Sequence, residues 1–180
     1  MYEVEVKVPA DLAVVRDRLA ALEATPEGAV VQVDTYYDAP HREFAETDEA
    51  LRIRSERPED AAEKTRVTYK GPLVDGESKT REEVETSVAD HEKTDAILTN
   101  LGFEAAATVR KERERFSIAG YTVTLDSVDD VGKYVEVETE VEDESALEAA
   151  RDGAYDVLER LELDPDDQLR TSYLGLLLES

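Results

Sequence analysis

Carboxylate and basic side chains recur at every second position in several stretches of the chain. A period of two places all members of such a stretch on one face of a β-strand. The acidic and basic sets occupy different stretches, so the two kinds of charge are sorted rather than mixed. The acidic sets are Glu3 with Glu5, Glu83 with Glu85, and Glu136 with Glu138 and Glu140, and the basic sets are Arg52 with Arg54, Lys70 following Thr68, and Lys111 with Arg113 and Arg115.

These two sets together suit one kind of chemistry. Guanidinium and ammonium groups bind phosphate oxygens through charge-assisted hydrogen bonds. Carboxylates beside a bound phosphate would repel it unless a divalent cation lay between them, and Mg²⁺ and Mn²⁺ bind carboxylate and phosphate oxygens together. The pattern therefore predicts a metal-dependent site that processes a phosphate compound.

A solvated polar face of an antiparallel sheet is the alternative explanation for any single strand. Basic residues are scarce, however, with 21 Lys and Arg against 45 Asp and Glu, yet the expected strands carry Lys7, Arg52, Arg54, Lys70, Arg81, Lys111, Arg113 and Arg115. A merely solvated surface of such a chain would be acidic. If the strands close into a barrel, the ionic faces line a polar lumen and helices cover the apolar outside.

About eight strands are needed to carry these faces, and helices are expected in the gaps between them. Alternation and β-branched residues predict strands at 1–8, 30–37, 51–54, 66–70, 81–88, 110–118, 121–126 and 134–141. Apolar residues at helical spacing predict helices at 9–24, 90–101, 144–161 and 169–178. Segments 57–63 and 71–78 are rich in Pro, Gly and Asp and are expected to be loops. Short connections between strands favour an antiparallel α+β fold over a doubly wound sheet.

Composition excludes several functions. The chain has 180 residues, suited to one domain, and a formal charge of −24, which disfavours binding to nucleic acid. The acidic residues are spread along the chain and lysines are few, which favours a halophilic source in which molar salt screens the repulsion. The lack of cysteine excludes thiolate chemistry and cysteine-ligated metals. The chain has no apolar run of membrane-spanning length and no apolar signal core, so we expect a cytoplasmic protein without membrane contact.

Eight motifs in order resemble the CYTH superfamily, also called the triphosphate tunnel metalloenzymes. The segment Glu3-Val4-Glu5-Val6-Lys7 resembles the E-x-E-x-K signature of that family. The other matching segments are Asp34–Asp38, Thr47–Arg54 with L-R-x-R, Thr68–Pro72 with T-Y-K-G-P, Arg81–Glu85 with R-x-E-x-E, Lys111–Arg113 with K-x-R, Leu125–Val128 followed by Gly132–Glu138, and Ser172–Leu174. Within the family, 32–37, 47–51 and 68–72 look most like the class IV adenylate cyclase branch.

The resemblance implies a single CYTH domain over residues 1–180, folded as an eight-stranded antiparallel β-barrel, or tunnel, with helices packed outside. It also implies roles for individual residues. Mg²⁺ or Mn²⁺ would be held by Glu3, Glu5, Asp126, Glu136 and Glu138. The triphosphate would be bound by Lys7, Arg52, Arg54, Lys70, Arg81, Lys111 and Arg113, with Arg170 as a weaker candidate. Glu83 and Glu85 would support these groups, and Lys70 with Tyr36 or Tyr37 would position a water nucleophile in a hydrolase.

Three functions are left open by the sequence. The resemblance implies either an adenylate cyclase that converts ATP to cyclic AMP and pyrophosphate, or a triphosphatase acting on tripolyphosphate or thiamine triphosphate. A non-catalytic module that binds polyphosphate or nucleotide is the third alternative. The family also implies a small-molecule triphosphate as the partner and a homodimer as an assembly. Arg115 and Glu140 extend the period-two pattern outside the motifs, and their role is open between structure and site.

Overall fold

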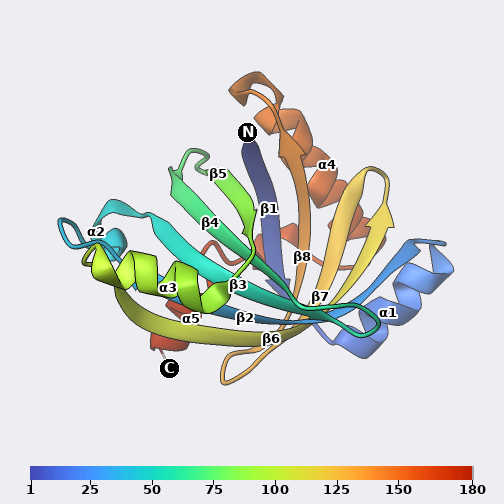
Figure 1. Cartoon of the computed structure of the whole chain (residues 1–180). Helices are drawn as coiled ribbons and strands as arrows, with labels where there is room; N and C mark the ends of the chain where they lie inside the picture. Colours follow the sequence, from blue (N-terminus) through green and yellow to red (C-terminus); the bar gives the residue numbers. More distant parts are fainter. Residues whose placement is uncertain (180) are drawn as a thin grey trace.

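Eight antiparallel strands close into a barrel in the computed structural model, which describes residues 1–179 (Figure 1). Around the barrel the strands follow the order β1-β5-β4-β3-β2-β6-β7-β8. The strands are β1 (Tyr2–Pro9), β2 (Thr25–Asp38), β3 (Ala50–Pro58), β4 (Lys64–Leu73), β5 (Lys79–Val88), β6 (Glu104–Ile118), β7 (Tyr121–Val128) and β8 (Gly132–Val141). The expected α+β barrel with helices outside is confirmed.

Five α-helices lie around the barrel rather than within its wall (Figure 1). They are α1 (Leu12–Ala21), α2 (Phe44–Thr47), α3 (His91–Asn100), α4 (Leu147–Arg160) and α5 (Tyr173–Glu179), and two 3₁₀ turns are η1 (Glu144–Ala146) and η2 (Pro165–Asp167). Helix α4 packs on β1 and β8, α1 packs on β7 and β8, and α5 contacts β6. No helix of the described residues is long and apolar enough to cross a membrane.

The main hydrophobic core lies between the barrel and helices α1 and α4. Alternate apolar residues of β1, β6, β7 and β8 point outward and meet the apolar stripes of the two helices. Leu19 of α1 and Leu158 of α4 are completely buried there, as are Val6 and Val137 of the barrel. Because the apolar side of each strand is used outside, the polar side must face the lumen.

Strand pairing brings the inward-facing charges into adjacent positions. Glu5 of β1 pairs with Glu138 of β8, and Asp34 of β2 pairs with Arg54 of β3. Further along the chain, Arg113 of β6 pairs with Asp126 of β7. Each pair joins residues on different strands, so the barrel determines which charges meet.

The element boundaries differ from the expected ones in several places; among them, β6 begins at Glu104 rather than at residue 110, and α5 begins at Tyr173 rather than at residue 169. Helix α1 begins at Leu12 rather than at residue 9, because Pro9 ends β1 and the Asp11 side chain accepts hydrogen bonds from two backbone amides at the helix start. Strands β3 and β4 extend into the segments 57–63 and 71–78 that were expected to be loops. Strand β2 begins at Thr25, and helix α2 had no counterpart in the sequence interpretation.

Candidate active site

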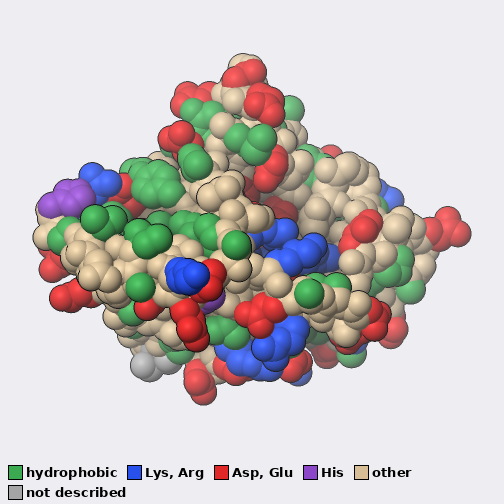
Figure 2. Space-filling model, in the orientation of Figure 1, with side chains coloured by type: hydrophobic (Ala, Val, Ile, Leu, Met, Phe, Trp, Pro, Cys, Tyr) green, Lys and Arg blue, Asp and Glu red, His purple; other side chains and the backbone are tan. Residues whose placement is uncertain are grey.

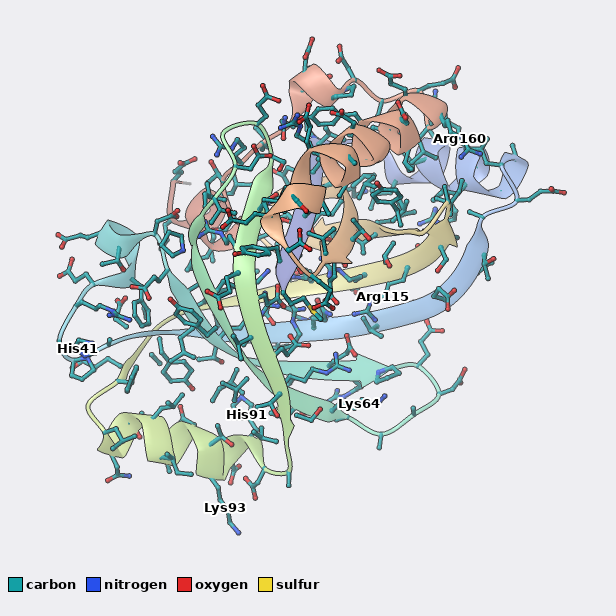
Figure 3. The ribbon with its side chains drawn as sticks, turned by 90° about the horizontal axis from the view of Figure 1, so that it is seen from above. His41, Lys64, His91, Lys93, Arg115 and Arg160 are labelled. Atoms are coloured by element: carbon teal, nitrogen blue, oxygen red, sulfur yellow. The ribbon has the colours of Figure 1, made fainter. Side chains whose placement is uncertain are left out.

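A cavity of about 430 Å³ occupies the lumen of the barrel. Its wall contains residues of β1, β2, β3, β4, β5, β6 and β8, and residues of α2 and α5 line it as well. Figure 2 shows a hollow in the middle of one face, in which Lys and Arg side chains gather. Among the labelled residues of Figure 3, Arg115 lies over strands β6 and β2 near the centre, whereas His41, Lys93 and Arg160 lie at the periphery.

Three carboxylates of β1 and β8 form the acidic part of the cavity. Oxygen atoms of Glu3, Glu5 and Glu138 all lie within 4.8 Å of one another. Burial, together with the charge of Glu3, raises the pKa of the Glu138 carboxyl to about 8. Lys79 Nζ lies 3.0 Å from Glu5 Oε2, yet this buried oxygen accepts no hydrogen bond from the described residues. Three converging carboxylates with an unsatisfied oxygen fit Mg²⁺ or Mn²⁺, which prefer such hard ligands.

The other two predicted metal ligands lie differently. Glu136 lines the cavity, and burial beside Glu5 raises its pKa to about 7. Asp126 is fully buried behind the wall of the cavity. Both of its oxygens accept hydrogen bonds from Arg113, at 2.7 Å each, and one also accepts from the Tyr173 hydroxyl at 2.6 Å. Metal binding by Asp126 therefore stays a prediction. In this structure its carboxylate is the hydrogen-bond partner of Arg113.

Cationic residues form another part of the wall, from β3, β4 and β6. Arg52, Arg54, Lys111 and Arg113 are buried and line the cavity. The buried Nε atom of Arg52 has no hydrogen-bond partner among the described residues, so this donor is unsatisfied. Burial, together with the charges of Arg54 and Arg113, lowers the pKa of Lys111 to about 7. These groups present several donors to an anion in the cavity.

Lys70 connects the basic and acidic parts of the cavity. Its Nζ donates to Glu3 Oε1 at 2.6 Å and lies 3.2 Å from Glu83 Oε2. Burial disfavours the charged form of Lys70, but the charge of Glu3 outweighs this and raises its pKa. Burial beside Glu3 raises the pKa of Glu83 to about 7, against the opposing effect of Lys70. Glu85 lies two residues after Glu83 on β5. It is partly exposed and accepts a hydrogen bond from the Thr68 hydroxyl at 2.7 Å.

Three other predicted phosphate ligands donate to backbone carbonyls of neighbouring segments. Lys7 is fully buried, donates to the backbone carbonyl of Thr171 at 2.6 Å and lies 4.1 Å from the centre of the Tyr173 ring. Arg81 lines the cavity but donates to the backbone carbonyls of Asp48 and Gly71, both at 2.7 Å. Arg170, the weaker candidate, donates to backbone carbonyls of the turn between β4 and β5. These contacts hold loop and C-terminal segments against the barrel.

The two predicted tyrosines have different positions. Tyr36 shares the inward face of β2 with Asp34 and pairs with Arg52 on β3. The ladder between β2 and β6 changes register between Tyr36 and Tyr37. The Tyr37 hydroxyl donates to Asp95 of α3 at 2.5 Å, and burial beside that carboxylate raises its pKa. Both tyrosines line the cavity, and the Tyr37 hydroxyl is the one already bonded to α3.

Sequence reasoning missed three residues that shape this site. Asp34 is the buried partner of Arg54, and its place two residues from Tyr36 in an alternating run was the available signal. Lys79 pairs with Glu5 but directly follows a segment expected to be a loop. Tyr173 of α5 reaches Asp126 and lines the cavity, which the C-terminal motif did not indicate.

Residues 1–173 match the family model of the CYTH domain, and the chain belongs to this family. Because the match ends at residue 173, the expectation of a single domain over residues 1–180 stays a prediction. A relative named “Putative adenylate cyclase MJ0240”, from Methanocaldococcus jannaschii, is 36% identical, and the alignment covers 98% of each chain. “Adenylate cyclase CyaB” of Aeromonas hydrophila is 27% identical over 82% of this chain and 72% of its own length.

Solved structures agree with this assignment. The PH1819 protein of Pyrococcus horikoshii superposes with a TM-score of 0.92 at 36% identity, covering 98% of both chains. The Hippeastrum protein HpAC1, for which a dominant triphosphatase activity is described, has a TM-score of 0.67 at 17% identity and covers 99% of this chain and 95% of its own. The latter likeness shows a shared fold.

Proposed function

We propose that this protein binds a small-molecule triphosphate together with a divalent cation in its tunnel and converts ATP to cyclic AMP and pyrophosphate. The observation that carries the proposal is a cavity with three converging carboxylates on one part of its wall and buried cations on another. The names of the two curated relatives favour the cyclase reaction over others on the same substrate class.

The chain's own residues supply binding and orientation. Arg52, Arg54, Lys111 and Arg113 would bind phosphate oxygens, and Lys70 would connect the phosphate chain to the acidic cluster. Such contacts would neutralise charge that develops on the phosphates. The metal, Mg²⁺ or Mn²⁺, would be held by Glu3, Glu5 and Glu138 with Glu136 close by, and would supply charge neutralisation at the phosphates.

In the cyclase reaction the ribose 3′-oxygen bonds to the α-phosphorus and the bond from that phosphorus to the β-phosphate oxygen breaks. The hydroxyl loses its proton and pyrophosphate leaves. Because little covalent help from the protein is needed, the cations must hold the triphosphate in line with the attacking oxygen.

Hydrolysis of tripolyphosphate or thiamine triphosphate is a second candidate. The position of Tyr36 on the cavity wall beside Arg52 favours it, since a tyrosine hydroxyl there could orient a water molecule toward a phosphate. The two reactions use the same binding groups and differ in the attacking oxygen.

The test is to incubate the purified protein in molar KCl with ATP, thiamine triphosphate or tripolyphosphate, with Mg²⁺ or Mn²⁺, and to separate the products by chromatography. Cyclic AMP with pyrophosphate supports the cyclase, and release of orthophosphate supports the hydrolase. Arg52→Ala should reduce turnover, whereas Arg160→Ala, at an exposed position on α4, should not. Binding without turnover would support the non-catalytic module. If the protein neither binds nor turns over any triphosphate, the proposal is refuted.

A further inference from the structure

One fully buried carboxylate faces several of the proposed phosphate-binding cations. Asp34 of β2 has no exposed surface. Its Oδ1 accepts from Arg54 Nε at 2.6 Å and its Oδ2 accepts from Arg54 Nη2 at 2.8 Å. Lys111 Nζ lies 3.5 Å from Oδ2, and Arg52 Nη1 lies 4.0 Å from the same oxygen. The three cations come from β3 and β6, the two strands that flank β2.

The position of Asp34 separates it from any ligand in the lumen. Arg52, Arg54 and Lys111 line the cavity, whereas Asp34 lies behind them in the wall. A substrate in the cavity would meet the cations first. Asp34 must therefore act on a substrate through the cations.

The strength of its contacts differs among the three cations. Arg54 uses one edge of its guanidinium group, Nε and Nη2, in a bidentate pair with Asp34, which fixes the plane of the group. Lys111 and Arg52 are held at 3.5 and 4.0 Å, distances at which a phosphate oxygen could compete for them. Arg54 is thus the cation whose orientation depends most on Asp34.

We propose that Asp34 is a positioning residue for triphosphate binding: it fixes the guanidinium plane of Arg54 and keeps Lys111 and Arg52 gathered on one part of the cavity wall before the substrate arrives. This inference rests on the proposed function, because it names how that site is prepared for its anion. Preorganised donors cost no reorganisation when the ligand binds, which is why such a carboxylate increases affinity.

A simple counter-ion would have the opposite effect, since a carboxylate that competes with phosphate for the cations weakens binding. Two features favour positioning. The bidentate geometry fixes a direction, which a counter-ion does not need. In addition, Lys111 is surrounded by Arg54, Arg113, Asp34 and Asp126, and the Asp34 charge is one of the influences that raise the pKa of this buried lysine. Removing that charge would favour neutral Lys111, so the lumen would gain little net positive charge.

The experiment compares Asp34→Asn, Arg54→Gln and the double variant with wild type, using tripolyphosphate as the probe in molar KCl. Calorimetry gives the dissociation constant, turnover gives KM and kcat, and a titration gives the half-saturating Mg²⁺ concentration. Glu56→Gln is the matched control. Glu56 is also a buried carboxylate bonded to an arginine, Arg115, but its ion pairs among the described residues are with Arg66 and Arg115 and with none of these three cations.

We expect Asp34→Asn to raise the dissociation constant and KM by roughly ten- to a hundredfold, the worth of one charge-assisted hydrogen bond. The half-saturating Mg²⁺ concentration should change little, and Glu56→Gln should change KM by less than about twofold, well below that range. The double variant should bind no worse than Arg54→Gln alone, because Asp34 acts largely through Arg54. If Asp34→Asn does not fold, the comparison of the double variant with Arg54→Gln tests the inference instead. In the double variant both side chains are neutral amides, so neither member of the pair is left charged.

Unchanged or tighter binding in Asp34→Asn would overturn the inference, and so would fully additive losses in the double variant or an equal loss in Glu56→Gln. If the wild-type protein itself neither binds nor turns over a triphosphate, the proposed function fails instead, so the two failures are distinguishable.

Discussion

Metal binding to the acidic cluster should release a proton, because the cluster is partly protonated when it is empty. Glu138 lies with Glu3 and Glu5 in a cavity that disfavours a third negative charge, and its pKa is raised to about 8. A carboxylate must be deprotonated to bind a metal ion. Mg²⁺ or Mn²⁺ therefore competes with the proton on Glu138.

The size of the effect follows from that pKa. At pH 7 a group with a pKa of about 8 carries a proton in about nine molecules of ten. Binding should then release close to one proton, and the apparent affinity should rise by roughly tenfold per pH unit below about pH 8 and level off above it. The affinity rises with pH because the raised pKa means that the metal-free cluster is protonated at neutral pH, and this competing proton is lost as the pH increases.

Calorimetric titration with Mg²⁺ in buffers of different ionisation enthalpy measures this proton directly. Glu138→Gln should abolish most of the release and weaken binding. Glu140→Gln, two residues further along β8 at an exposed position, should keep it. Equal binding enthalpies in all buffers, with an affinity that does not change between about pH 6 and 8, would refute the reasoning, because no shifted carboxylate would then bind the ion.

Three further predictions concern activity and stability. In a titration of rate against Mg²⁺, Glu138→Gln should require more metal, whereas Arg52→Ala should raise KM by roughly ten- to a hundredfold at nearly unchanged metal demand; the same response in both would show that the roles are misassigned. Burial opposes ionisation of Glu56, but hydrogen bonds from Arg115 and Gln32 lower its pKa to about 2, so its stabilising effect should be present above about pH 4.5 and disappear as the pH falls toward 2. Melting curves against pH should show this loss, and Glu56→Gln should flatten it; a wild-type curve that is flat in this range would contradict the assignment. The melting temperature should rise from low to molar KCl, because a formal charge of −24 is then screened, and a flat or falling dependence would remove the halophilic interpretation.

Much of the fold was accessible from local pattern. Alternation with a period of two marked seven of the eight strands, a run of β-branched and aromatic residues marked β2, and an apolar stripe marked α4. Asp90 and Gly102 correctly bracketed helix α3, because a cap residue and a glycine satisfy the backbone at the helix ends. Boundaries failed where barrel pairing extended a strand through residues that favour turns, as in β4 at Gly71 and Pro72.

The residue types of the site also followed from the sequence, but their partners did not. Asp126 looked like Glu136 and Glu138, a carboxylate on an inward face, yet it lies behind the wall against Arg113 and Tyr173. Tyr36 and Tyr37 are adjacent in the sequence and both line the cavity, and only the tertiary structure gives the Tyr37 hydroxyl its partner on α3.

The sequence by itself determined which residues share a face, because the side-chain period of a strand is a local property. If the strands close into a barrel, the same period brings the scarce cations and the abundant carboxylates into one lumen. The tertiary structure decided which charge meets which: Lys70 meets Glu3 across 67 positions, and Lys111 approaches Asp34 across 77. Those pairings depend on strand order and register around a closed barrel, and a shift of one residue would turn a whole face outward.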